Sequence, residues 1–265
     1  MSSVLSFGDQ SKLRKLRLRL ETDDQHFDGL RKLHLSGKEL GSVPVEVFLI
    51  ADLEVLVLSP ERESCIDYCL QSVPRAIGLL TNLRVLILDT NELDEVPDEL
   101  CDLLQLERLH LSNNAIRALP EGIGKLRRLT SFHASNNKLE NLPATFAELS
   151  SLRFLDLSSN RLEELPPEVT QLRGLQSLVL VYNRLRRLPD AICDLTDLRM
   201  LWIGYNRIRQ LPSHFGDLRD LDWGSRAHTS SLAIDGNPLI RPPIDICRQG
   251  TRAIESYFAR DRDSP

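Results

Sequence analysis

Two histidines and a carboxylate recur at one spacing in the middle of this sequence. His110, His133 and Asp156 lie 23 residues apart, and a serine follows each of them two residues later. These serines are Ser112, Ser135 and Ser158. Serine, histidine and aspartate together form the set used for nucleophilic hydrolysis. Two histidines with a carboxylate could instead hold a metal ion. The choice depends on the elements that position these side chains.

The spacing belongs to a repeat that runs along most of the chain. Asparagine recurs every 23 residues in the frame L-x-x-L-x-L-x-x-N-x-L, as in LERLHLSNNAIRALP at 106–120. Asn237 keeps this frame only if its repeat starts at Thr229, eight residues later than the period requires. The full column comprises Asn91, Asn114, Asn137, Asn160, Asn183, Asn206 and Asn237.

This long pattern, matched many times over, resembles that of leucine-rich repeats. The resemblance implies an α/β solenoid, or horseshoe, with a parallel sheet on its concave face. Short helical or 3-10 turns are expected on the convex face. Counting the first leucine of the frame as position 1, the residues at positions 1, 4, 6 and 11 point inward. Burial of each leucine stabilises the fold by roughly 1.5–3 kcal/mol before entropy is counted.

The repeat divides the chain into three parts. An N-terminal cap occupies 1–29, about nine repeats occupy 30–240, and a C-terminal helix and tail occupy 241–265. Departures from the period predict insertions near 61–69 and 219–228. A helical apolar stripe in the last part can cover the open end of the core. This stripe consists of Ala253, Ile254, Tyr257 and Phe258.

The N-terminal cap contains an alternating segment, KLRKLRLRLE. Leu16, Leu18 and Leu20 share one face of an extended chain, and Arg17 and Arg19 share the other, which is a strand period. We therefore expect an irregular first strand of the sheet, whose basic side chains discourage pairing with another chain. The alternative is a basic patch for an acidic partner, acidic lipid or nucleic acid, which strong salt dependence of binding would reveal.

The asparagine column is predicted to be a structural spine. Each turn of a solenoid reverses the chain and leaves backbone polar groups facing the core. A buried asparagine side chain carries two donors and an acceptor. Stacked asparagines can therefore satisfy the backbone of their own repeat and of the adjacent one.

The concave face changes character along the repeats. Frame positions 3, 5, 7 and 8 are expected to face the hollow, in columns that cross strands about 4.8 Å apart. These columns are basic at the start, then apolar, then polar, and finally aromatic and apolar. The last zone is the candidate protein-binding face, because interfaces enrich aromatic residues, methionine and arginine. The alternative is that valine and aromatic residues merely suit strands. The candidate residues are Phe154, Arg161, Val179, Val181, Tyr182, Arg184, Met200, Trp202, Tyr205 and Arg207.

This placement weakens the catalytic and metal interpretations of His110, His133 and Asp156. A hydrolytic triad requires a dry pocket with an oxyanion hole, which an open sheet does not offer. Cys65 and Cys69 have a metal-like spacing, but no second pair lies close in the sequence. We therefore interpret Cys65 and Cys69 as free thiols in a loop. We predict a chain that is not an enzyme and needs neither a metal nor a cofactor.

Composition limits the class of partner. The net charge is −5, which makes nucleic acid an improbable partner. No apolar run has membrane-spanning length, and MSSVLSFGDQSKLRK lacks the apolar stretch of a secretory signal. The five scattered cysteines suit reduced thiols. We expect a monomer located in the cytoplasm or the nucleus.

The end of the repeat region allows a narrower comparison. The ending N-P-L-x-x-P-P…G…A-I…Y at 237–257, after 23-residue repeats that end in L-P, resembles intracellular leucine-rich proteins of the Ras-group and Scribble types. The resemblance implies a protein-binding scaffold or adaptor in signalling, with a small GTPase or another signalling protein as partner. The alternative is the recognition module of a larger enzyme of the kinase or ubiquitin-ligase type.

Overall fold

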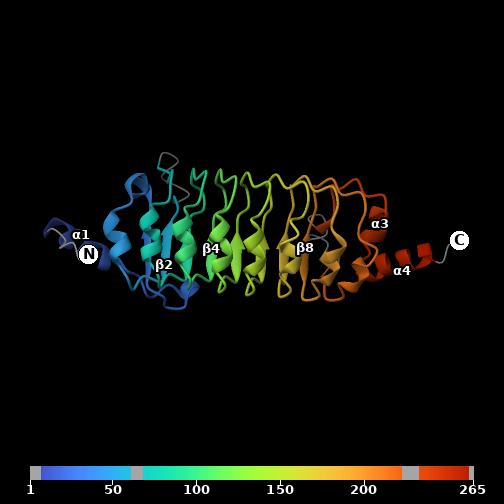
Figure 1. Cartoon of the computed structure of the whole chain (residues 1–265), viewed down its shortest axis with the longest axis horizontal. Helices are drawn as coiled ribbons and strands as arrows, with labels where there is room; N and C mark the ends of the chain where they lie inside the picture. The colour runs from blue at the N-terminus through green and yellow to red at the C-terminus, as the bar shows by residue number, and fades with distance from the viewer. Residues whose placement is uncertain (1–6, 61–67, 223–232, 263–265) are drawn as a thin grey trace.

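The computed structural model describes residues 7–60, 68–222 and 233–262. The chain forms an elongated solenoid in which successive turns add strands to a single sheet (Figure 1). Within the described residues, eight strands lie in sequential order and every neighbouring pair is parallel, which confirms the predicted fold. The strands are β1 (Lys32–Leu35), β2 (Val55–Leu58), β3 (Val85–Ile87), β4 (Arg108–His110), β5 (Ser131–His133), β6 (Phe154–Asp156), β7 (Ser177–Val179) and β8 (Met200–Trp202).

Short 3-10 turns return the chain from each strand to the next, as the repeat predicts. In most of the regular repeats a proline immediately precedes the turn. For example, the carbonyl of Pro120 accepts a hydrogen bond of 3.1 Å from the amide of Ile123. Turn η1 (Gln25–Phe27) lies before β1. The turns that follow the strands are η2 (Gly37–Ser42), η3 (Val45–Leu49), η4 (Arg75–Leu79), η5 (Asp98–Asp102), η6 (Glu121–Lys125), η7 (Ala144–Glu148), η8 (Val169–Gln171), η9 (Asp190–Asp194) and η10 (Phe215–Asp217).

The register of the sheet places equivalent frame positions side by side. His110 is paired with His133 across β4 and β5, and His133 is paired with Asp156 across β5 and β6. One continuous leucine-rich core lies between the sheet and the 3-10 turns. Phe132, Phe146 and Phe215 are its largest fully buried side chains.

The asparagine column lies at the edge of this core and bonds as the sequence predicts. The side-chain oxygen of Asn160 accepts a hydrogen bond from the amide of Leu139, at 2.9 Å. Its amide nitrogen donates to the carbonyls of Ala134, Leu157 and Ser158, at 2.8, 3.1 and 3.1 Å. The other six asparagines of the column make the same kinds of bond. The column is therefore a structural spine.

The N-terminal segment is a helix, and the predicted strand was wrong. Helix α1 spans Phe7–Arg17, so the alternation of leucines does not define one face. Leu16 is 6% exposed, whereas Leu18 just beyond the helix is 80% exposed. Leu13 and Leu16, three residues apart, both pack against the core. Leucine, lysine and arginine favour helices, and α1 packs on η3 at the open end of the solenoid.

The C-terminal end is covered by two helices, α3 (Ile244–Cys247) and α4 (Thr251–Arg262). Of the predicted apolar stripe, Ile254 and Phe258 are buried, and Tyr257 packs partly against the core. Helix α4 packs on η10, where Glu255 lies against Gly216. Both ends of the core are thus closed by helices. Within the described residues, no helix is long and apolar enough to cross a membrane.

Most residues of the two predicted insertions lie outside the described part of the chain. The same is true of Cys65 and of the start of the last repeat at Thr229. Asn237 of that repeat is described, and it bonds to the amide of Ile208 in the preceding repeat at 3.0 Å. The last repeat therefore joins the spine despite its irregular length.

Candidate functional site

The middle of the concave face carries a stack of aromatic rings. In β4, β5 and β6 the central residue is buried, while the residues on either side of it are half-buried on the concave face. The rings of His110 and His133 stack with their centroids 4.2 Å apart. The ring of His133 stacks in turn on Phe154 at 4.6 Å. Adjacent repeats therefore build one aromatic column across three strands.

The polar groups around this column do not form a hydrolytic relay. Nδ1 of His110 lies 3.5 Å from Asp89 rather than beside Asp156. The carboxylate of Asp156 accepts hydrogen bonds from the amide and the hydroxyl of Ser158, at 2.9 and 2.5 Å. Nε2 of His133 lies 2.8 Å from the hydroxyl of Ser131. Burial, together with the neighbouring His110, lowers the pKa of His133 to about 4. At neutral pH the His133 ring is therefore uncharged.

The described part of the chain contains no group of three or more His, Cys, Asp or Glu residues that could hold a metal ion. Cys65 lies outside that part, so the structure does not address its spacing to Cys69. Cys101 and Cys193 are buried reduced thiols, and burial raises their pKa to about 11 and about 12. Thiols in this state are poor nucleophiles and poor metal ligands.

The predicted protein-binding residues lie together over β6, β7 and β8. Phe154, Met200 and Trp202 are half-buried on the concave face. Val179 and Val181 occupy the predicted columns but are only 6% and 7% exposed. These two valines therefore form a floor beneath their neighbours and offer little surface to a partner. The resulting surface is an apolar zone about three strands wide.

Two stacked tyrosines border this apolar zone. Tyr182 and Tyr205 occupy frame position 8 in successive repeats and are 51% and 42% exposed. Both have left-handed backbone, with φ of 57° and 54°. A bulky side chain is rarely found in this region. Other repeats place small or polar residues there, such as Asn113 and Asn136. At the equivalent position of the last repeat, Gly236 lies against the Tyr205 ring.

A row of arginines follows the tyrosines at frame position 10. The guanidinium of Arg161 lies 3.9 Å from Glu140. Arg184 and Arg207 are exposed and form no ion pair within the described residues. By contrast, Arg186 and Arg187, two and three residues after Arg184, pair with carboxylates of the preceding repeat at 2.8 and 3.3 Å. Arg184 and Arg207 therefore present available positive charge beside the two tyrosines.

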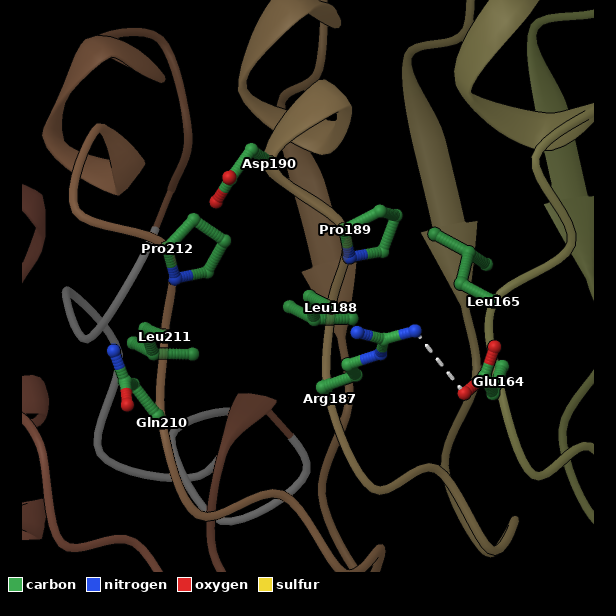
Figure 2. A pocket seen from close by; sticks show the side chains of 9 residues that line it. All are labelled: Glu164, Leu165, Arg187, Leu188, Pro189, Asp190, Gln210, Leu211 and Pro212. Carbon is green, nitrogen blue, oxygen red and sulfur yellow. Dashed lines mark hydrogen bonds and ion pairs between the residues drawn. The ribbon is translucent and has the colours of Figure 1, made fainter.

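A recess between consecutive repeats lies beyond this arginine row. Figure 2 shows its lining, in which Arg187 reaches across to Glu164. The recess has a volume of about 470 Å³. Leu188 and Leu211 at its base belong to the buried core, while the rim is polar. It follows from the repeat geometry and lacks the largely apolar lining that small-molecule sites usually have.

The N-terminal zone of the concave face is less accessible than the sequence suggests. Lys32 pairs with Asp24 at 2.7 Å, and Arg31 pairs with Asp52 at 3.0 Å. The apolar residues that follow on β2 and β3 are covered by Phe27 and its neighbours. The repeat pattern does not predict this cover, because Phe27 lies in a non-periodic stretch, DDQHFDGL. The accessible concave face therefore begins near β4.

Comparisons with known proteins agree with this architecture. The chain matches two family models, a leucine-rich repeat region at 144–233 and a leucine rich repeat at 81–139 and 105–162. The repeated motif, the parallel sheet and these matches define a leucine-rich repeat protein. A search of curated proteins finds no match to the chain.

Solved structures support the same assignment. The chain is 29% identical to a leucine-rich repeat protein of Leptospira interrogans, with a TM-score of 0.67. The match covers 83% of this chain and 57% of the Leptospira chain. It is 27% identical to the ectodomain of the plant membrane receptor kinase GASSHO1/SCHENGEN3 from Arabidopsis thaliana, solved with CASPARIAN STRIP INTEGRITY FACTOR 2. That match has a TM-score of 0.63 and covers 79% of this chain and 26% of the receptor chain.

The plant peptide hormone receptor RGFR1, solved in complex with RGF2, gives a similar result. Its identity is 25% and its TM-score is 0.61, over 78% of this chain and 31% of the receptor chain. The chain thus spans less than two thirds of the length of each of these three structures.

Proposed function

We propose that this chain is a non-catalytic scaffold or adaptor that binds a protein partner through the C-terminal half of its concave face. The proposal depends most on one observation, the exposed stack of Tyr182 on Tyr205. Left-handed backbone costs of order 1–3 kcal/mol at each bulky residue. Folding does not require tyrosine here, since earlier repeats use asparagine or serine at the same position. Recognition of a partner supplies a reason for the tyrosines.

The surrounding chemistry supports the proposal. Phe154, Met200 and Trp202 supply the apolar contact area that dominates binding energy at interfaces. Arg161, Arg184 and Arg207 form a polar rim along one side. Since Arg184 and Arg207 have no carboxylate partner in the described residues, acidic groups of a partner would find them available. We propose that the apolar zone anchors the partner while the arginines select an acidic flank.

The finer assignment follows the sequence resemblance to intracellular scaffolds of the Ras-group and Scribble types. On that basis we propose a signalling role in the cytoplasm or nucleus, with a small GTPase or another signalling protein as partner and a monomeric chain. We also propose that the chain is not an enzyme, because the carboxylate of Asp156 bonds to Ser158 rather than to a histidine.

A second function is favoured by the comparisons. Two of the similar structures are much longer receptor chains, one of which is named a receptor kinase. The chain could thus serve as the recognition module of a larger enzyme of the kinase or ubiquitin-ligase type. Sequencing of the full-length transcript distinguishes the two, because only this second function requires a catalytic domain in the same polypeptide.

The primary test is affinity capture from cytosol with a double variant, Trp202→Ala with Arg184→Glu. We expect the partner recovered by the wild-type chain to be lost or strongly reduced, as measured by quantitative mass spectrometry. The matched control is Arg127→Glu, which reverses an arginine that is 71% exposed and lies outside the concave columns. Undiminished recovery with the double variant, or equal loss with the control, would exclude this face as the binding site.

A further inference from the structure

The N-terminal zone of the concave face is occupied by the chain itself. After α1, residues 21–31 cross the first strands, drawn in blue beneath the label of β2 in Figure 1. We call residues 21–31 the strap. The strap covers an aliphatic patch that consists of Val55, Val57, Val85 and Ile87.

The strap is held in place by a small set of polar contacts. Glu21 and Lys32 exchange two backbone hydrogen bonds of 2.9 Å in an antiparallel bridge. The carboxylate of Asp24 accepts a hydrogen bond from the amide of His26 at 3.0 Å, which starts the turn η1. The same carboxylate lies 2.7 Å from Nζ of Lys32. Asp28 and Gly29 then reverse the chain with left-handed backbone, at φ of 52° and 75°.

The side chain of Phe27 makes the principal contact with the patch. Its ring packs on the aliphatic side chains and lies between two cations. Nζ of Lys32 is 5.3 Å from the ring centroid, and the guanidinium carbon of Arg108 is 5.2 Å from it. These are cation–π distances. An aliphatic floor with a cation on either side is suited to an aromatic ring that carries acidic neighbours.

The burial of the patch shows how completely this ring fills it. Val55 and Val85 occupy frame position 3 and are 0% and 1% exposed. At the same position in later repeats, Arg108 and Ser131 are half-buried. Without the strap, the valines would lie on an open sheet, as those later residues do. An apolar patch of this kind on a concave surface is typical of an interaction site.

We propose that the patch is a second binding site, for a partner segment that carries a carboxylate three residues before an aromatic side chain. The strap presents that chemistry itself, with Asp24 and Phe27 followed by Leu30, and acts as an internal occupant. The site lies on β2–β4, apart from the tyrosine and arginine surface on β6–β8. It therefore stands independently of the function proposed above.

The strap is suited to displacement. Most of its polar residues face solvent, and its contacts with the sheet are one backbone bridge, ion pairs made by Glu21, Asp24 and Arg31, and a few apolar side chains. Segments with so few buried contacts open at low cost compared with global unfolding. Because the strap is covalently attached, it competes at a high effective concentration. An external segment should therefore bind weakly to the wild-type chain and better to a chain whose strap is weakened.

The test uses a fluorescein-labelled peptide with the sequence of residues 20–31, LETDDQHFDGLR. Its binding to the full chain is measured by fluorescence anisotropy at low ionic strength. We expect saturable binding to the Phe27→Ala chain and about tenfold weaker binding to the wild type, because the intact strap competes. A peptide with alanine in place of its phenylalanine should not bind. If Phe27→Ala does not fold, Asp24→Ala weakens the strap at its ion pair and takes its place.

Two further variants locate the peptide on the chain. In the Phe27→Ala background, Arg108→Glu should abolish binding, because it reverses one of the two flanking charges. Arg117→Glu is the matched control, an exposed arginine in the same repeat outside the concave columns, and it should leave binding unchanged. The proposal is overturned if a folded strap-weakened chain fails to bind the peptide. It is also overturned if the wild type binds equally well, or if both charge reversals reduce binding to the same extent.

Discussion

The rings of Tyr182 and Tyr205 lie 4.6 Å apart, with 15° between their planes, although each residue adopts left-handed backbone. The two rings therefore form a flat aromatic edge that is held by backbone geometry and by each other. Aromatic pairs contribute about 0.5–1.5 kcal/mol beyond the burial of their area. That gain is of the same order as the backbone cost, so the pair is close to neutral for folding.

We predict that Tyr182→Asn weakens partner binding without a comparable loss of stability. Asparagine tolerates left-handed backbone. The relief of backbone strain should therefore offset the loss of the ring stacking, and the free energy of unfolding should stay within about 1 kcal/mol of the wild type. Affinity for the partner should fall by about tenfold or more, as for an interface anchor. Denaturant titration and a binding isotherm measure the two effects. A large loss of stability with unchanged affinity would show that the tyrosines serve the fold instead.

We predict that Asn160→Leu lowers the free energy of unfolding by about 2 kcal/mol or more. The change leaves the amide of Leu139 without its acceptor and the carbonyl of Ala134 with only the longer bond from Asn137, and an unsatisfied buried group costs about 1–3 kcal/mol. Equilibrium denaturation in urea measures the loss. The exposed Asn141→Leu is the control and should change stability by less than about 0.5 kcal/mol. An unshifted unfolding midpoint for Asn160→Leu would contradict the structural role of the spine.

We predict that His133 makes the fold less stable in mild acid. Its pKa is lowered from 6.5 to about 4 in the folded chain, so the unfolded chain binds the proton more readily. Stability is therefore fully present above about pH 6.5 and is lost as the pH falls towards 4. After solvent screening the loss should be on the order of 1–2 kcal/mol. His133→Phe, which keeps an aromatic ring in the stack, should reduce this pH dependence. Thermal unfolding at several pH values measures this pH dependence of stability.

We predict that Lys12→Ala is more costly than an ordinary surface change. Nζ of Lys12 lies 3.2 Å from Glu46, whose side chain is only 3% exposed. Loss of the lysine leaves this carboxylate buried without its partner, which should cost about 1–3 kcal/mol. Arg127→Ala is the control, because its partner Glu148 is 50% exposed and the pair should contribute little. Similar losses in both variants would mean that Lys12 is a surface residue without a special role.

The period of the sequence predicts most of the fold because one structural unit is repeated. The pairing of His110 with His133 and the bonding of Asn160 both follow from counting 23 residues. The columns of side chains on the concave face of the sheet also follow from this count. The burial of Val179 and Val181 does not, because the frame assigns a direction to a side chain but not the size of its neighbours.

The N-terminal region could not be predicted from the sequence in the same way. The leucines at 16, 18 and 20 fit a strand, while those at 13, 16 and 20 fit a helix equally well. The open end of the core decides between them, because it requires a cover and α1 packs there on η3. The strap has no period at all, and its position depends on Phe27 finding the aliphatic patch.

The spine gives the solenoid a direction. Asn160 sends its hydrogen bonds to its own repeat and back to the preceding repeat, at Ala134 and Leu139. Melting from the C-terminal end would therefore remove each asparagine and leave the backbone amide and carbonyl that it bonded in the preceding repeat without this partner. Melting from the N-terminal end would instead leave an asparagine stripped of half its partners at the new boundary. The two ends of a partly melted solenoid thus differ in chemistry: an asparagine side chain is exposed at the N-terminal boundary, and a backbone amide and carbonyl are exposed at the C-terminal boundary.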